Sequence, residues 1–212
     1  MPPKQRFTPD DIIEAAFNVV RKNGWEGLSA RAIAKELDCS TGPIYSYLES
    51  MKNLEEEVVK KAMALIYSYL STPRTGDPWL DQALGHVLFA VREKHLFRGV
   101  YDEKYLPLTR NVSPKVWSDL REQLDGYELF QGLSEEQISL IRMARWFFGH
   151  GLSHLANVNW FTVDEENNIV IGEKGKEKII NLVDLMRMAD LAIFKGFKEF
   201  ERIDDKPPEN DG

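Results

Sequence analysis

The sequence, 212 residues long, has little of what several classes of protein require. Its one cysteine, Cys39, excludes an internal disulfide and cannot build a thiolate metal site alone. Apolar residues never run for the ~18 positions of a membrane span. The first six residues also lack the apolar core of a signal peptide. These absences predict a protein that stays in the cytoplasm.

Catalytic motifs are missing as well. The sequence has no Ser/His/Asp or Cys/His constellation and no glycine-rich phosphate loop, so nothing in it calls for an enzyme or a bound cofactor. One pattern keeps an alternative open. His150 and His154 lie one helical turn apart, the spacing of a zinc-binding pair, but Gly151 stands where a metalloprotease has its glutamate. A helical metal-dependent enzyme is therefore the alternative to the function argued below; ligand or interface hydrogen bonding and core packing are other roles for this pair.

The charge is unevenly distributed. The chain carries a net charge of −7, yet residues 1–54 hold seven Lys or Arg and seven Asp or Glu. The rest of the chain therefore carries the whole negative excess. Because an acidic surface repels nucleic acid, the N-terminal segment is the part that escapes this repulsion.

Helical periodicity runs through most of the chain and predicts an all-α fold. Apolar residues recur at i, i+3, i+4 and i+7, and strand-like alternation is rare. The exception is a polar loop over residues 158–173, in which Trp160–Val163 can pair with Ile169–Ile171 as a short hairpin; a last helix follows over about 174–201. Helix starts are marked by capping residues. The expected caps are Thr8, Ser29, Ser40, Ser50, Asp77, Ser113 and Ser134.

The stretch STGPIYSYLES, residues 40–50, begins a short helix in an unusual way. Three helices lie in the N-terminal segment, and a tight turn joins the last two, which is the pattern of a helix-turn-helix. The second helix of that motif enters the major groove of DNA. Gly42 would remove side-chain bulk where the helix end approaches DNA, and Pro43 lies in the first turn, where its missing N–H breaks no helical bond.

The two sides of this short helix have different expected roles. Ile44 and Leu48 are one turn apart and would anchor the helix, so Thr41 and Tyr45 face the groove. A tyrosine hydroxyl there can donate to a phosphate without adding charge. The alternative is a small helical bundle with solvent-facing tyrosines and no nucleic acid partner.

These residues resemble a known family. Residues 8–66 are similar to the DNA-binding domain of the tetracycline-repressor (TetR/AcrR) family of transcription regulators. The resemblance implies an all-helical homodimer whose C-terminal domain binds a small effector. The motif as it stands here is Ile12-Ile13-x-Ala15-Ala16, Gly24, Ser29-x-x-x-Ile33-Ala34, Ser40-x-x-x-Ile44-Tyr45-x-Tyr47-Leu48, Ser50 and Leu54.

The resemblance also implies which residues contact DNA. One group lies at the turn and the start of the reading helix, where it faces bases or nearby backbone; another holds phosphates; and the N-terminal arm adds two basic residues. The expected DNA-binding residues are Arg31, Ser40, Thr41, Gly42, Pro43, Tyr45, Tyr47, Lys52, Lys4 and Arg6.

Three positions depart from the family pattern. Asp38 replaces the usual turn glycine, and aspartate tolerates the left-handed conformation better than most residues. Cys39 replaces a small apolar residue, and we expect it to be a buried packing thiol rather than a redox sensor. The lysine that often follows the cap of the next helix is Met51 here, with Lys52 one residue further on, so one phosphate contact differs.

The expected organisation follows from the motif. Residues 1–54 form a helix-turn-helix domain, and a helix over 50–70 connects it to a helical effector-binding and dimerisation domain, residues 55–203. A charged, proline-containing tail over 204–212 is expected to be disordered.

Aromatic residues concentrate in the middle of the larger domain, where they could fill a core or line a ligand pocket. Arg142 and Arg145 would suit an acidic ligand, although solvent-facing charges are the more usual role. The expected effector is therefore small and apolar or aromatic. The expected ligand-binding residues are Phe89, Phe97, Tyr101, Tyr105, Trp117, Trp146 and His150.

The helices over 134–157 and 174–201 have apolar arcs too wide for one buried side, so we expect them to form the interface of a two-fold dimer. The sequence thus predicts a ligand-responsive transcription regulator, a repressor that an effector releases from a pseudo-palindromic double-stranded DNA operator. The expected dimer residues are Leu152, Leu155, Met186, Ile193 and Phe197.

Overall fold

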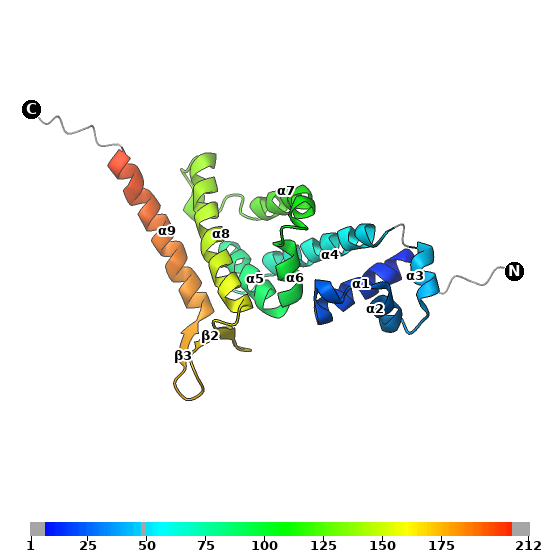
Figure 1. Cartoon of the computed structure of the whole chain (residues 1–212). Coiled ribbons are helices and arrows are strands. Elements are labelled where there is room, and N and C mark those ends of the chain that lie inside the picture. The colour runs from blue at the N-terminus through cyan, green and yellow to red at the C-terminus, as the bar shows by residue number, and fades with distance from the viewer. Residues whose placement is uncertain (1–6, 48–49, 205–212) are drawn as a thin grey trace, which may run out of the picture. The chain divides into compact units, whose positions relative to one another are not determined.

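Figure 1 shows the computed structural model of the chain, which describes residues 7–47 and 50–204. Helices dominate it, which confirms the all-α prediction of an N-terminal helix-turn-helix followed by a larger helical part. The chain forms two compact units. Unit 1 takes the residues up to 69 together with 92–122, and unit 2 takes 70–91 and the residues from 123 onward. The division expected at residue 54 stays a prediction.

Unit 1 begins with a helix whose ends follow the sequence signals. The hydroxyl of Thr8 accepts from the Asp11 N–H at 3.2 Å, and the Asp11 carboxylate accepts from the Thr8 N–H at 2.7 Å. Gly24, at φ 79°, ends the helix, and its N–H donates to Val20. The elements of this unit are α1 (Pro9–Asn23), the 3-10 turn η1 (Trp25–Gly27), α2 (Ala30–Glu36), α3 (Thr41–Tyr47), most of α4 (Met51–Ser71), α6 (Lys94–Val100) and α7 (Leu106–Glu122).

α7 differs from the sequence prediction. A helix start was expected at Ser113-Pro114, but α7 begins at Leu106 and runs through Pro114. Proline at this position cannot donate to the carbonyl four residues earlier, that of Arg110. The Ser113 hydroxyl donates to that same carbonyl at 3.4 Å. The serine is therefore a substitute donor inside the helix, not a cap.

The helix-turn-helix is tied to α6 and α7 within unit 1 through one tryptophan. The indole N–H of Trp25 donates to the His95 carbonyl at 2.9 Å, and its ring lies 4.4 Å from that of Tyr105. Gly99 lies under the indole, where there is no space for a side chain. α1 packs against α6 beside this contact.

Unit 2 is built around an aromatic core. Trp79, Phe130 and Phe194 pack together with ring centroids 5.1–6.0 Å apart, and Ile141 is buried among them. The Ser134 capping box confirms the expected start of the long helix in this unit. The elements are α5 (Pro78–Arg92), the 3-10 turn η2 (Glu128–Phe130), α8 (Glu135–Asn157), β1 (Thr162–Val163), β2 (Asn168–Ile171), β3 (Lys178–Asn181) and α9 (Leu182–Asp204).

A small antiparallel sheet lies where the chain passes from α8 to α9 (Figure 1). The expected hairpin is confirmed, because Thr162 pairs with Val170 and Val163 with Ile169. β3 was not predicted. It pairs with β2 through Ile169–Ile180 and Val170–Ile179, and it replaces the first residues of the expected last helix, which begins at 182 rather than 174. Cross-strand pairing of these β-branched residues therefore stabilises a strand more than the local apolar pattern stabilises a helix.

Several predicted features lie outside the described residues: the arm residues Lys4 and Arg6, the anchor Leu48 and the tail beyond Asp204. Across residues 7–47 and 50–204, the search for a helix both long and apolar enough to cross a membrane found none.

Candidate DNA-binding interface and effector region

The turn between α2 and α3 has the geometry that the sequence requires. Asp38 adopts φ 49°, the left-handed conformation, so aspartate takes the place of glycine as expected. The N–H of Cys39 donates to Ala34 at 2.9 Å, which closes the end of α2. Cys39 is only partly buried, so the expected fully buried thiol is not what the structure shows.

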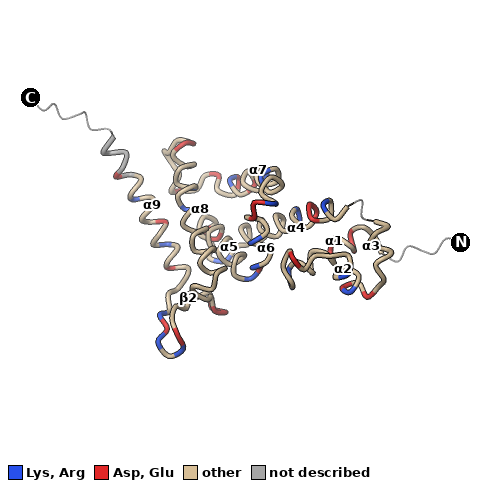
Figure 2. The backbone as a smooth tube through the Cα atoms, viewed as in Figure 1, with Lys and Arg blue, Asp and Glu red and all other residues tan. Residues whose placement is uncertain are grey.

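α3 presents one side to the protein and another to solvent. Ile44 is completely buried, whereas Tyr45 is 67% exposed and Thr41 is partly exposed. A side chain at Gly42 would meet only the Ser40 hydroxyl, at 3.8 Å, so the protein's own packing does not require glycine there. No Lys or Arg lies on α3 (Figure 2). Its exposed side therefore offers hydroxyl groups rather than charge.

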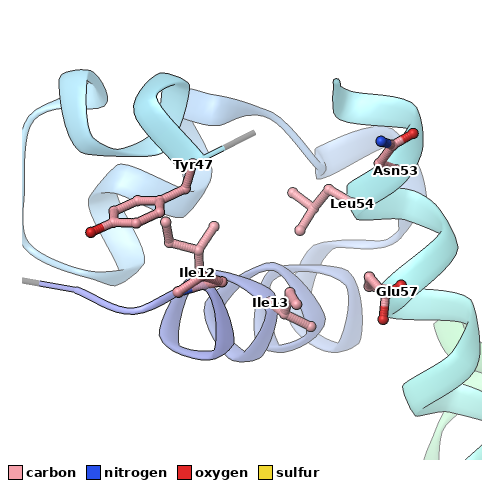
Figure 3. Close-up of a pocket in the computed structure, with 7 residues that line it drawn as sticks. Ile12, Ile13, Tyr47, Asn53, Leu54 and Glu57 are labelled. Atoms are coloured by element: carbon pink, nitrogen blue, oxygen red, sulfur yellow. The ribbon is translucent and has the colours of Figure 1, made fainter. Parts of the chain in front are cut away.

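Tyr47 lies apart from this exposed side. Its ring lies over Ile12 and lines a hollow of about 210 Å³ between α1 and α4 (Figure 3). Its hydroxyl is shielded from solvent and makes no hydrogen bond with the described residues. The structure therefore separates two tyrosines for which the sequence predicts the same role.

The remaining expected DNA contacts come from neighbouring elements. Arg31 on α2, Ser40 before α3 and Lys52 on α4 are all exposed, and Pro43 is partly exposed in the first turn of α3. Sequence reasoning passed over Ser46, which is exposed beside Tyr45 and donates to the Gly42 carbonyl at 3.1 Å.

The expected effector residues of unit 1 take part in separate contacts. Phe97 and Tyr101 lie with ring centroids 4.9 Å apart. Tyr105 packs on Trp25, so it supports the helix-turn-helix contact described above. Trp117 on α7 is 39% exposed.

Two expected effector residues of unit 2, Trp146 and His150, form a cluster with His86 between α5 and α8. Trp146 stacks on His150 at 5.1 Å, and His86 meets His150 edge to face at 5.8 Å. Phe89 is buried on α5. Burial lowers the pKa of His86 to about 3 and also lowers that of His150, with the neighbouring imidazole and nearby Arg145 adding to the effect at His86. Both imidazoles are therefore neutral at physiological pH.

The two histidines of the metal alternative do not converge on a site. His150 takes part in the aromatic cluster, while His154 is exposed. A search of the described part of the chain found no group of three or more His, Cys, Asp or Glu able to hold a metal ion. His86, which the sequence did not single out, is the histidine that His150 meets.

The burial of Arg145 differs from the sequence prediction. The sequence favoured a solvent-facing charge, but only 8% of the residue is exposed. Its guanidinium lies 3.3 Å from the centre of the Trp79 ring and donates to the Trp79 carbonyl. Burial lowers the pKa of Arg145 to about 10, against the opposing effect of Asp190.

The expected dimer residues divide between core and surface. Met186 is buried in the protomer, and Ile193 and Phe197 pack against the aromatic core of unit 2. Leu152 is partly buried and Leu155 is exposed. A different set of apolar side chains is exposed at helical spacing on α8 and α9. This set, the exposed apolar face, comprises Leu140, Met143, Phe147, Leu155, Met188 and Leu191.

Comparison with known proteins agrees with this geometry. Residues 12–58 match the family described as bacterial regulatory proteins, tetR family. A solved structure of a TetR family protein from Vibrio parahaemolyticus is similar in fold, with a TM-score of 0.53 and 20% identity over 89% of this chain and 97% of that chain. No curated protein matches.

The helix-turn-helix followed by a helical domain defines a DNA-binding transcription regulator. Residues 12–58 thus form a helix-turn-helix similar to that of the tetR family, and the fold of the chain is similar to that of a TetR family protein.

Proposed function

We propose that the chain is a cytoplasmic, dimeric repressor that reads its operator with α3 and leaves it when a small apolar or aromatic effector binds. The observation that carries the reading role is the exposed side of α3. Gly42 has room for a side chain yet has none, and the neighbouring Tyr45 extends into solvent. Both features suit a surface that a phosphate backbone approaches closely.

Tyr45→Phe is expected to weaken operator binding by about 1 kcal/mol, because it removes one hydroxyl donor to a phosphate. Thr41→Ala is expected to relax base preference at one or two positions. Gel-shift titrations against the operator and its single-base variants measure both. Tyr47→Phe is the matched control and is expected to change affinity less, since its hydroxyl is shielded from solvent.

If both Tyr45→Phe and Thr41→Ala keep full affinity and selectivity, α3 does not read the operator. Circular dichroism of each variant shows whether helix content is retained. A Tyr47→Phe variant that loses as much affinity as Tyr45→Phe would place both tyrosines on the phosphates, as the family resemblance implies.

The chemistry of the effector is inferred from unit 2. Phe89, Trp146 and His150 present apolar or neutral aromatic surface, since burial keeps the imidazoles uncharged. Such surface binds apolar and aromatic molecules better than anions. Buried Arg145 is already engaged by Trp79, which removes one reason to expect an acidic ligand.

A ligand can weaken DNA binding only by preferring the arrangement that does not bind DNA. α4 begins at Met51, four positions after the last residue of α3, Tyr47, and continues to Ser71 as one helix. A ligand that moves its far end would tilt α3. Coupling of about 1–3 kcal/mol corresponds to a 5–150-fold loss of operator affinity.

Aromatic and fatty-acid-like compounds that raise the melting temperature are expected to lower operator affinity by roughly 5-fold or more when titrated into a preformed complex. Trp146→Leu is expected to reduce both effects together, and Trp160→Leu, an exposed tryptophan outside the cluster, is the control. Stabilising compounds that never change operator affinity would show that this region is not a sensor.

A further inference from the structure

A second candidate binding site lies in unit 2, and none of Phe89, Trp146 and His150 lines it. It is a cleft of about 540 Å³ lined by the start of α5, the η2 segment and α9. Its wall is largely apolar, which suits the body of an organic ligand. Three aromatic and three aliphatic side chains form that wall: Trp79, Tyr127, Phe194, Leu80, Leu129 and Leu191.

A buried carboxylate lies in this wall. Asp190 on α9 lines the cleft although only 8% of the residue is exposed. Its Oδ1 accepts no hydrogen bond of ordinary geometry from the described residues. Burial raises the pKa of Asp190 to about 6, while Arg145 and the Trp79 indole oppose that rise, so the group is mostly ionised at neutral pH. A buried anion with an unsatisfied oxygen is unfavourable unless a cation or donor approaches it.

The second carboxylate of the cleft is already occupied. Asp77 accepts from the N–H groups of Trp79 and Leu80 at 3.0 and 3.3 Å, which caps α5. It also accepts from the Tyr127 hydroxyl at 3.0 Å. Asp77 therefore holds the Tyr127 ring against the cleft, and Asp190 remains the carboxylate available to a ligand.

The basic side chains nearby do not neutralise the site. Arg145 is held over the Trp79 ring and does not line the cleft. At the rim, Arg187 lies 3.9 Å from Asp184, and Lys195 lies 3.9 Å from Glu199. Among the residues that line the cleft, three are acidic, Asp77, Asp190 and Glu199, and two are basic, Arg187 and Lys195, which leaves one negative charge in excess.

We propose that this cleft binds a small lipophilic organic cation, with its charge toward Asp190 and its apolar body against Trp79, Tyr127 and Phe194. The excess negative charge favours a cation over an anion. Aromatic rings add to this preference, because their faces attract positive charge when water is excluded. The apolar wall favours a hydrophobic cation over a metal ion or a small ammonium ion.

The test is isothermal titration of the full chain with tetraphenylphosphonium, and with tetraphenylborate as a control of the same shape and opposite charge. The cation is expected to bind once per chain, at least tenfold more tightly than the anion. Asp190→Asn is expected to weaken the cation at least tenfold. Asp184→Asn, which removes an exposed carboxylate of the same helix, is expected to change affinity less than twofold.

Leu129→Lys provides a variant at a half-exposed position that leaves the core and the exposed apolar face intact. Its new ammonium group at the cleft is expected to weaken the phosphonium at least tenfold, with Leu129→Met unchanged. Equal binding of the two probes, or full affinity in both Asp190→Asn and Leu129→Lys, would overturn the proposal. Binding confined to a monomeric variant would also overturn it, because a second copy would then be the occupant of the cleft.

Discussion

A Phe147→Glu variant is expected to sediment as a monomer at micromolar concentration and to lose roughly 100-fold or more in operator affinity. Phe147 is 59% exposed on α8 and lies in the middle of the exposed apolar face. We propose that this face pairs with the same face of a second copy, since monomeric proteins rarely expose a contiguous apolar patch of this kind to water. Burial of a carboxylate there would oppose pairing. Two linked half-site contacts bind about 10²–10⁴-fold more tightly than one, so losing the partner is costly.

The matched control is Ile179→Glu, which introduces the same charge at a 65% exposed apolar residue of β3, outside the exposed apolar face. Sedimentation velocity and operator titration of this variant are expected to match the unmodified chain. Phe197→Glu is a poorer test than the sequence suggested, because Phe197 packs against the core of unit 2 and its loss would affect folding as well. A dimeric Phe147→Glu with full operator affinity would move the interface elsewhere.

The second large effect is expected from Gly99→Ala in α6. Glycine to alanine inside a helix usually stabilises a protein by roughly 0.5–1 kcal/mol. Here the added Cβ would lie 2.6 Å from Cζ2 of Trp25 and closer still to Nε1 and Cε2. The indole cannot move away without losing its bond to His95 and its contact with Tyr105. The expected result is destabilisation by about 1–3 kcal/mol in urea unfolding.

Operator affinity of Gly99→Ala is expected to fall as well, since Trp25 ties the helix-turn-helix to α6. Gly149→Ala is the control: it is also a helical glycine, and a Cβ there would meet nothing within 4 Å. It is expected to be neutral or stabilising. Trp25→Phe removes the indole atoms that clash, so Trp25→Phe/Gly99→Ala is expected to be no less stable than Trp25→Phe alone. A Gly99→Ala as stable as Gly149→Ala would show that the Trp25 contact does not constrain α6.

The two tyrosines of α3 show how far sequence reasoning reaches. Alternation around the helix correctly separates Ile44 from Tyr45, because the spacing of residues fixes which side each occupies. The same reasoning gave Tyr47 a phosphate contact. The structure turns its ring over Ile12 of α1, some 35 residues earlier in the chain, and the phosphate contact stays a prediction. The position of a residue in a helix determines the direction in which its side chain leaves the backbone. Which apolar residues the ring then contacts depends on the neighbouring helix.

By itself, the sequence determined the helix-turn-helix, the caps at Thr8, Ser50 and Ser134, the left-handed Asp38 and the short hairpin. These features depend on interactions between residues only a few positions apart, so their signals are local. The tertiary structure alone decided that Trp25 covers Gly99 and that Arg145 and Asp190 share one region of unit 2. Those contacts join residues 45 to 74 positions apart, and packing of whole helices creates them; no local pattern in the chain encodes which distant side chain will be the neighbour.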